Sequence, residues 1–154
     1  MRVLQLLPEL KFGGVERGTV DLSEHLTKLG HQSAVVSAGG GLTEQLSNHG
    51  AKHFSLPIAK KNFLAIKQYK NLREIYREFK PDIIHVRSRF PAWINVLALK
   101  GLSSSKPIVI STFHGLYSKP FYSKSMSYAN DIIAISKTVQ EYVFKNYDVD
   151  HLSL

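Results

Sequence analysis

The sequence predicts an α/β fold, a doubly wound, Rossmann-like parallel sheet with helices on both faces in three layers. Two observations support this prediction. Short apolar runs alternate with longer amphipathic stretches along the whole 154-residue chain, which is the pattern of repeated βαβ units. Most positions within the short runs are apolar, as expected for strands that are covered on both faces. The length and the 44% of hydrophobic residues favour one domain over residues 1–154 with a real core.

The first half of the chain contains three predicted strands, at residues 3–7, 34–37 and 53–56, and two predicted helices, at residues 15–29 and 42–48. Pro8 and Pro57 end the first and third strands, because proline cannot donate a hydrogen bond to a neighbouring strand. The first helix carries its apolar residues on one stripe, and Gly30 ends it. A right-handed crossover should connect the first two strands.

The second half contains three more predicted strands, at residues 82–86, 107–112 and 131–135. Helices are predicted at residues 62–80, 91–99 and 137–146, with a further one at the end of the stretch 117–128. Pro81 should end the first of these helices, since the residue before a proline avoids helical geometry. Pro91 can occupy the first turn of the second, which is apolar nearly all round and should be the most buried helix. Ser136 should cap the last helix.

The composition restricts the class of protein. The chain has 20 Lys and Arg against 12 Asp and Glu, a net charge of +8 and a pI near 9.7, which favours anionic partners. It has no cysteine, so disulfides and thiolate metal sites are excluded and a reducing cytoplasm is the expected compartment. No apolar run approaches the roughly 20 residues of a membrane span, and the N-terminus resembles a strand more than a signal peptide. His49 and His53 are separated by Gly50, so we expect no metal site.

The loop after the first strand, residues 11–18, is the strongest candidate for a ligand site. Gly13 and Gly14 stand between a strand and a helix, where glycines permit close approach and backbone angles that other residues avoid. The helix N-terminus after them suits an anionic group such as a phosphate. Glu16 and Arg17 lie in the first helical turn, within reach of the same crevice. The alternative is an ordinary loop in which Glu16 only favours the helix dipole.

Further polar residues follow the other predicted strands, and the carboxyl ends of parallel strands form one edge of a sheet where ligands bind. His114, beside Gly115, can approach a ligand there. Each of the others has a structural alternative: a buried core histidine, solvated surface arginines and a helix cap. The candidates at this edge are His85, Arg87, Arg89, His114 and Ser136.

The predicted helix 62–80 is basic. Together with its preceding turn it holds seven Lys and Arg (60, 61, 67, 70, 73, 77 and 80) against Glu74 and Glu78. Helical spacing places Lys67, Lys70, Arg73 and Arg77 on one exposed side. This side could dock on an anionic membrane, or it could be a solvated surface. Nucleic acid is a poorer candidate, because no exposed aromatic residues are interleaved with the cations.

Motifs of several enzyme classes are absent. The chain has neither the Gly-x-Ser-x-Gly elbow of α/β-hydrolases nor the Gly-x4-Gly-Lys-Ser/Thr loop of P-loop enzymes. Its glycines at 13, 14 and 18 do not have the Gly-x-Gly-x-x-Gly spacing of dinucleotide enzymes. These absences disfavour a hydrolase, a P-loop enzyme and a dehydrogenase.

Jointly, the motifs resemble the N-terminal half of family-4, GT-B-fold retaining glycosyltransferases, especially bacterial ones that act on cell-surface saccharides such as lipopolysaccharide or polysaccharide. The resemblance covers essentially the whole chain. It rests on Gly-Gly-Val-Glu-Arg at residues 13–17, Pro-Asp-Ile-Ile-His-Val-Arg-Ser-Arg at 81–89, Pro-Ala-Trp at 91–93, Thr-Phe-His-Gly at 112–115 and Ile-Ala-Ile-Ser at 133–136.

The resemblance implies the roles of individual residues. Gly13 and Gly14 would lie near the donor phosphates, and His114 near the transferred sugar. Glu16, Arg17, His85, Arg87, Arg89 and Ser136 would line the acceptor side or the cleft. The nucleotide-sugar would be a co-substrate, and no cofactor or metal is expected.

The resemblance also implies a C-terminal domain that holds most of the nucleotide-sugar, and the sequence does not contain it. We therefore expect the chain to be a truncated or natural fragment that is inactive alone. Acceptors would be saccharides or glycolipids, and the location cytoplasmic, with possible attachment to the inner membrane face. Two alternatives remain open, namely a non-catalytic module that binds anionic saccharide or membrane, and a nucleotide-dependent oxidoreductase.

Overall fold

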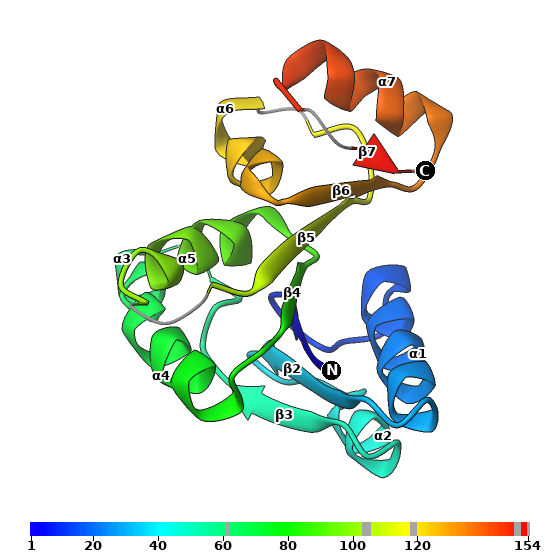
Figure 1. Cartoon of the computed structure of the whole chain (residues 1–154), viewed down its shortest axis with the longest axis vertical. Coiled ribbons are helices and arrows are strands. Elements are labelled where there is room, and N and C mark those ends of the chain that lie inside the picture. Colours follow the sequence, from blue (N-terminus) through cyan, green and yellow to red (C-terminus); the bar gives the residue numbers. More distant parts are fainter. Residues whose placement is uncertain (61, 103–105, 118–119, 150–151, 154) are drawn as a thin grey trace.

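The chain forms one parallel sheet with helices on both faces (Figure 1). The computed structural model describes residues 1–60, 62–102, 106–117, 120–149 and 152–153; Lys61 and the serines at 103–105 lie outside this part. The described strands are β1 (Arg2–Leu6), β2 (Gln32–Ser37), β3 (Lys52–Ser55), β4 (Ile83–Val86), β5 (Ile108–Phe113), β6 (Asp131–Ala134) and β7 (Leu152–Ser153). Their order is β3-β2-β1-β4-β5-β6-β7, and every neighbouring pair is parallel. The predicted fold class is confirmed.

The described helices are α1 (Gly14–Lys28), α2 (Thr43–Asn48), α3 (Phe63–Ile66), α4 (Tyr69–Phe79), α5 (Arg89–Leu99), α6 (Pro120–Ser123), the 3-10 helix η1 (Lys124–Tyr128) and α7 (Lys137–Asn146). Figure 1 shows α1 and α2 on one face of the sheet and α4 and α5 on the other. A small core cluster joins Val20 of α1, Val35 of β2 and Leu46 of α2. A larger one includes Leu4, Leu72 and Ile94 and extends to Val143 of α7. Helices therefore cover both faces, as the apolar strands require.

The strand order reverses next to β1. From β1 the chain first adds β2 and β3 on one side, and β4 then pairs with the other side of β1. The loops after β1 and β4 consequently leave the sheet toward opposite faces, which opens a crevice between them. Both candidate segments, the glycine loop and residues 87–89, begin at this crevice.

The predicted single helix over residues 62–80 is wrong. Two helices, α3 and α4, occupy this stretch, and a turn at residues 67–68 separates them. The Asn62 side chain accepts a hydrogen bond from the Ala65 N–H, and the Gln68 N–H returns to the Ala65 carbonyl over only three residues, so the first helix closes tightly and stops. The predicted end before Pro81 is confirmed, with Lys80 left-handed at φ 50°.

Candidate functional site

The glycine loop after β1 is held in place by the loop after β2. The Leu10 N–H donates to the Gly39 carbonyl at 2.9 Å, and the Leu42 N–H donates to the Leu10 carbonyl at 2.9 Å. Gly40 has φ +152°, and a Cβ on it would lie 2.4 Å from the carbonyl carbon and oxygen of Leu10. Only glycine fits this position without displacing the loop. The glycine triplet at residues 39–41 is visible in the sequence, but the sequence did not predict that the loop after β2 pairs with the loop after β1.

The expectation that Gly13 and Gly14 adopt unusual backbone angles is wrong. Gly13 is extended, with φ −143°, and Gly14 is the first residue of α1. The space around the two glycines differs. A Cβ on Gly14 would meet no atom within 4 Å, whereas a Cβ on Gly13 would lie 2.4 Å from Oε2 of Glu16. The N-terminus of α1 thus faces open space at Gly14, and the Glu16 carboxylate folds back over Gly13.

Arg17 points along α1 toward α2. Its Nη1 donates to Oε1 of Gln45 at 3.2 Å on an exposed surface. The side chain of Arg17 is therefore joined to a neighbouring helix, whereas its backbone N–H donates to the Gly13 carbonyl at 2.9 Å.

Arg87 is the central charged group of the crevice. Its Nη1 donates to Oε1 of Gln5 at 3.1 Å, and Gln5 in turn donates to the carbonyl of Thr19 at 3.0 Å and to Oγ of Ser23 at 2.9 Å. A Cβ on Gly18 would lie 3.3 Å from Nη2 of Arg87. Strand β1 and helix α1 together fix this guanidinium, so it is not a solvated surface charge.

One nitrogen of Arg87 remains available. Its Nε is buried and has no hydrogen-bond partner among the described residues. Burial also lowers the pKa of the guanidinium from its usual value. A desolvated cation with an unused donor is unfavourable unless an anion or a polar ligand reaches it. The sequence did not point to the two residues that surround the Arg87 guanidinium, Gln5 and Gly18. A polar residue inside an apolar strand and a lone glycine in a helix carry no specific signal.

The two histidines lie beside Arg87. His85, inside β4, shares a hydrogen bond of 2.7 Å with Oγ1 of Thr112 through its Nε2. Burial, followed by the nearby charges of Arg87 and His114, lowers the pKa of His85 to about 3. His85 is therefore a neutral, satisfied core histidine at neutral pH, with a side chain as its partner.

His114, just after β5, is different. Burial and the charge of Arg87 lower its pKa to about 4, so the ring is neutral at neutral pH. Its Nε2 is buried without a hydrogen-bond partner in the described part of the chain. Arg87 and His114 thus each have a side-chain nitrogen without a partner in the described part of the chain. His85 lies next to them within the sheet, and its own ring is already hydrogen-bonded to Thr112.

Arg89 lies among aromatic rings. Its guanidinium carbon is 4.6 Å from the ring centre of Tyr117 and 5.3 Å from that of Tyr122, which is cation–π geometry. Tyr117 also accepts a long hydrogen bond, 3.4 Å, from the His114 N–H. These contacts place Arg89 in the cluster that adjoins His114.

Ser136 has the local role expected of it. Its Oγ accepts a hydrogen bond from the Val139 N–H at 3.3 Å and caps α7. Satisfying an unpaired N–H of a helix start is a sufficient reason for a serine at this position.

The prediction that four cations share one exposed side is wrong for Arg73. Its Nε and Nη2 donate to the carbonyls of Ala98 and Leu97 at 3.0 and 3.1 Å, at the C-terminal end of α5. Arg77 is exposed but pairs with Glu74. Lys67 and Lys70 are exposed. The packing of α4 against α5 explains the difference, because Arg73 reaches the carbonyls of α5 from the same helix that carries the exposed Lys70 and Arg77.

The structure adds two findings about other classes of site. No helix among the described residues is long and apolar enough to cross a membrane. The same part of the chain contains no group of three or more His, Cys, Asp or Glu side chains that could hold a metal ion.

The parallel sheet, with its strand-order reversal at β1 and helices on both faces, is a Rossmann-like domain of the kind found in GT-B glycosyltransferases. Residues 12–153 match the model of Glycosyltransferase Family 4, and the chain belongs to that family. A search of curated proteins gave no match.

Three solved structures show the extent of the likeness. A glycosyltransferase from Rickettsia africae ESF-5 is 34% identical, with a TM-score of 0.80 over 97% of this chain and 40% of that one. The apo form of the lipopolysaccharide outer core galactosyltransferase WaaB is 16% identical, with a TM-score of 0.75 over 100% and 45%. MurG of Acinetobacter baumannii is 13% identical, with a TM-score of 0.70 over 99% and 44%. The last two show the fold alone, and the chain spans less than half the length of each protein.

Proposed function

We propose that this chain is the acceptor-side, N-terminal half of a retaining glycosyltransferase. The complete enzyme transfers a sugar from a nucleotide-sugar donor to a saccharide or lipid-linked acceptor of a bacterial cell surface. The observation that carries the proposal is the convergence at one crevice of the open N-terminus of α1, the unused Nε of Arg87 and the unused Nε2 of His114. A C-terminal domain supplies most of the nucleotide site, so this half is inactive alone.

The crevice supplies positive charge and hydrogen-bond donors for a diphosphate. The N–H groups at Gly13 and Gly14 and the dipole of α1 favour a phosphate there. Arg87 adds a fixed cation, which stabilises the charge that develops on the leaving phosphate. The Glu16 carboxylate, which now covers Gly13, swings away when a phosphate binds and then faces the acceptor with Arg17. The nucleotide-sugar is a co-substrate, and no other cofactor is proposed.

His114 is proposed to contact the transferred sugar. Because its pKa lies near 4, the ring is neutral at neutral pH and acts as a hydrogen-bond partner of a sugar hydroxyl. A neutral imidazole has one donor and one acceptor nitrogen. Arg89, held against Tyr117 and Tyr122, lines the same side of the cleft.

A chimera tests this proposal. The chain is joined to the C-terminal domain of the Rickettsia africae glycosyltransferase, and release of nucleoside diphosphate from a panel of nucleotide-sugars is measured for the chimera and for the chain alone. We expect turnover only in the chimera, a loss of about a hundredfold or more in His114→Ala, and an unchanged anomeric configuration in the product by NMR. Turnover by the chain alone would contradict the assignment of the donor site to the other domain.

A second proposal concerns a membrane surface, and the exposed residues around the break between α3 and α4 support it. Leu64 is 68% exposed and Ile66 38% exposed, and Lys67 and Lys70 follow them. Apolar side chains beside lysines suit the interface of an anionic bilayer. Such attachment would place the enzyme at the cytoplasmic face of the membrane, close to lipid-linked acceptors.

A further inference from the structure

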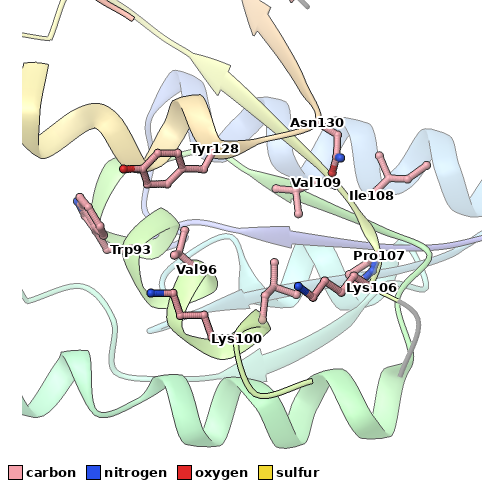
Figure 2. A pocket seen from close by; sticks show the side chains of 10 residues that line it. Trp93, Val96, Lys100, Lys106, Pro107, Ile108, Val109, Tyr128 and Asn130 are labelled. Atoms are coloured by element: carbon pink, nitrogen blue, oxygen red, sulfur yellow. Dashed lines mark hydrogen bonds between the residues drawn. The ribbon is translucent and has the colours of Figure 1, made fainter. Parts of the chain in front are cut away.

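A second cavity lies away from the crevice, beside the start of β5. Its volume is about 660 Å³, within the range of small-ligand sites. Figure 2 shows Trp93 and Tyr128 at one end and Lys106, Pro107 and Ile108 at the other. The helix α5, expected to be the most buried, lines the cavity with Trp93, Val96 and Leu99, and Lys100 follows directly after the helix. Part of its apolar surface is therefore open to a ligand.

Two aromatic rings form one wall of the cavity. The rings of Trp93 and Tyr128 meet edge to face, with centres 6.2 Å apart and planes at 86°. Trp93 Nε1 donates to the carbonyl of Tyr122 at 2.8 Å, which fixes the orientation of the indole. Tyr128 remains 51% exposed. The wall is thus rigid, apolar and accessible, with a phenol hydroxyl at its rim.

The cavity also has polar groups along its lining, namely Lys100, Lys106 and Asn130. Lys100 and Lys106 are exposed, and neither side-chain ammonium group makes an ion pair or a hydrogen bond within the described part of the chain. Asn130 uses its Oδ1 to accept from the Val109 N–H at 2.8 Å, which directs its amide group and leaves Nδ2 as a donor. Two cations and an amide donor therefore line the same cavity as the aromatic wall.

We propose that this cavity binds one unit of an acidic saccharide, a sugar that carries a carboxylate or a phosphate. The C–H face of a pyranose packs on an aromatic ring, here Tyr128 or Trp93, while Lys100 and Lys106 pair with the acid group. The sugar hydroxyls form hydrogen bonds with the Asn130 amide and the Tyr128 hydroxyl. A concave cavity with a fixed wall suits a single sugar better than the broad surface of a bilayer. This site does not depend on the proposed transfer reaction.

The single tryptophan of the chain provides the test, because it lines the cavity. The 154-residue chain is titrated with trigalacturonate and, separately, with the uncharged maltotriose, and tryptophan fluorescence is recorded at low and high salt. We expect a saturable, salt-sensitive change with trigalacturonate that is at least about tenfold weaker in affinity with maltotriose.

Matched variants separate this site from general charge attraction. Lys100→Ala/Lys106→Ala should weaken trigalacturonate binding about tenfold or more, and Tyr128→Ala should weaken it while Tyr128→Phe retains most of it. Lys137→Ala/Lys145→Ala, which removes the same charge from α7, should bind like the wild type. Because both cavity lysines are exposed, the unfolding midpoint should not move. Equal binding of the two sugars, equal effects of the two lysine pairs, or a fluorescence change only with phosphatidylglycerol vesicles would overturn the proposal.

Discussion

Arg87 shows how a single residue can be prepared for a ligand before the ligand arrives. Gln5 accepts from its guanidinium and is itself fixed by two groups of α1, so the cation cannot turn toward solvent. Holding a charge in this way lowers the stability of the empty site, because desolvation is only partly offset by a neutral amide. An anion in the crevice would recover that loss. This is the behaviour expected of a preorganised binding group.

Two glycines allow function and stability to be separated. Gly14→Ala should leave stability unchanged or raise it by up to about 1 kcal/mol, since the new Cβ meets no atom and alanine favours the helix. In the chimera it should nevertheless lower turnover about tenfold or more, because the methyl group occupies the space proposed for the donor phosphate.

Gly40→Ala is the matched comparison. With φ +152° and a clash against Leu10, it should lower the free energy of unfolding by about 1–3 kcal/mol or more. Urea unfolding measures both effects on stability. If Gly14→Ala retains full turnover, the glycine loop does not hold the phosphate.

The buried histidines predict how stability depends on pH. Unfolded histidine has a pKa near 6.5, whereas His85 and His114 titrate near 3 and 4 in the folded chain. As the pH falls below about 6.5, the unfolded state takes up protons that the folded state does not, so stability decreases, by up to about 1.4 kcal/mol per pH unit for the buried His85 and by less for the half-exposed His114, where solvent screens the charge. Urea unfolding between about pH 6.5 and pH 4.5 measures this slope.

His85→Gln removes one titrating group and should reduce that slope by about 1.4 kcal/mol per pH unit. Thr112→Val removes the hydrogen-bond partner of His85 but keeps the imidazole, so it should lower stability and leave most of the slope. Equal slopes in the wild type and in His85→Gln would show that His85 is charged in the folded chain.

At the scale of elements, Arg73 shows why helical spacing can predict an exposed side chain where the structure has one in contact with a neighbouring helix. Its spacing suits an exposed basic face, yet it binds the last carbonyls of α5. Gly101 leaves the room this requires, since a Cβ there would lie 2.1 Å from Cζ of Arg73. Arg73 thereby satisfies carbonyls that the end of a helix leaves unpaired.

Arg73→Ala should therefore lower the free energy of unfolding by about 1–3 kcal/mol, although the residue reads as a surface cation. Lys70→Ala, one turn earlier on α4, should change it by less than about 0.5 kcal/mol. Thermal or urea unfolding of the two variants provides the comparison. A similar small effect for both would mean that the contacts with α5 contribute no net stability.

Strands and caps could be predicted from the sequence because their signals are local. Pro8, Pro57 and Pro81 marked element ends, and Ser136 capped its helix as expected. The helix break at residues 67–68 depends on a side-chain cap at Asn62, which spacing does not reveal. The short strand β7 was missed, since two residues carry too little pattern. In the candidate site, His114 and Arg87 stood out by position, whereas Gln5 and Gly40 act through contacts with distant segments.

At the scale of the whole molecule, the crevice and the proposed membrane surface lie in different parts of the fold. The crevice forms between the loops that follow the neighbouring strands β1 and β4, and the proposed membrane surface consists of Leu64, Ile66, Lys67 and Lys70 around the break between α3 and α4. The sheet gives both a common rigid support. A bilayer bound at that break would therefore hold the crevice at a fixed height above the lipid, where the proposed lipid-linked acceptor would present its sugar.

Vesicle binding tests this arrangement. The chain should co-sediment with vesicles that contain phosphatidylglycerol, and less at high salt, because each lysine near an anionic surface contributes about 1 kcal/mol. Lys67→Glu/Lys70→Glu should weaken binding about tenfold or more, whereas Lys137→Glu/Lys145→Glu, with the same change in charge on α7, should have a much smaller effect. Equal losses in both pairs would mean that only the net charge of +8 attracts the vesicles. Leu64→Ser should lower the binding that remains at high salt, because insertion of an apolar side chain is not screened by ions.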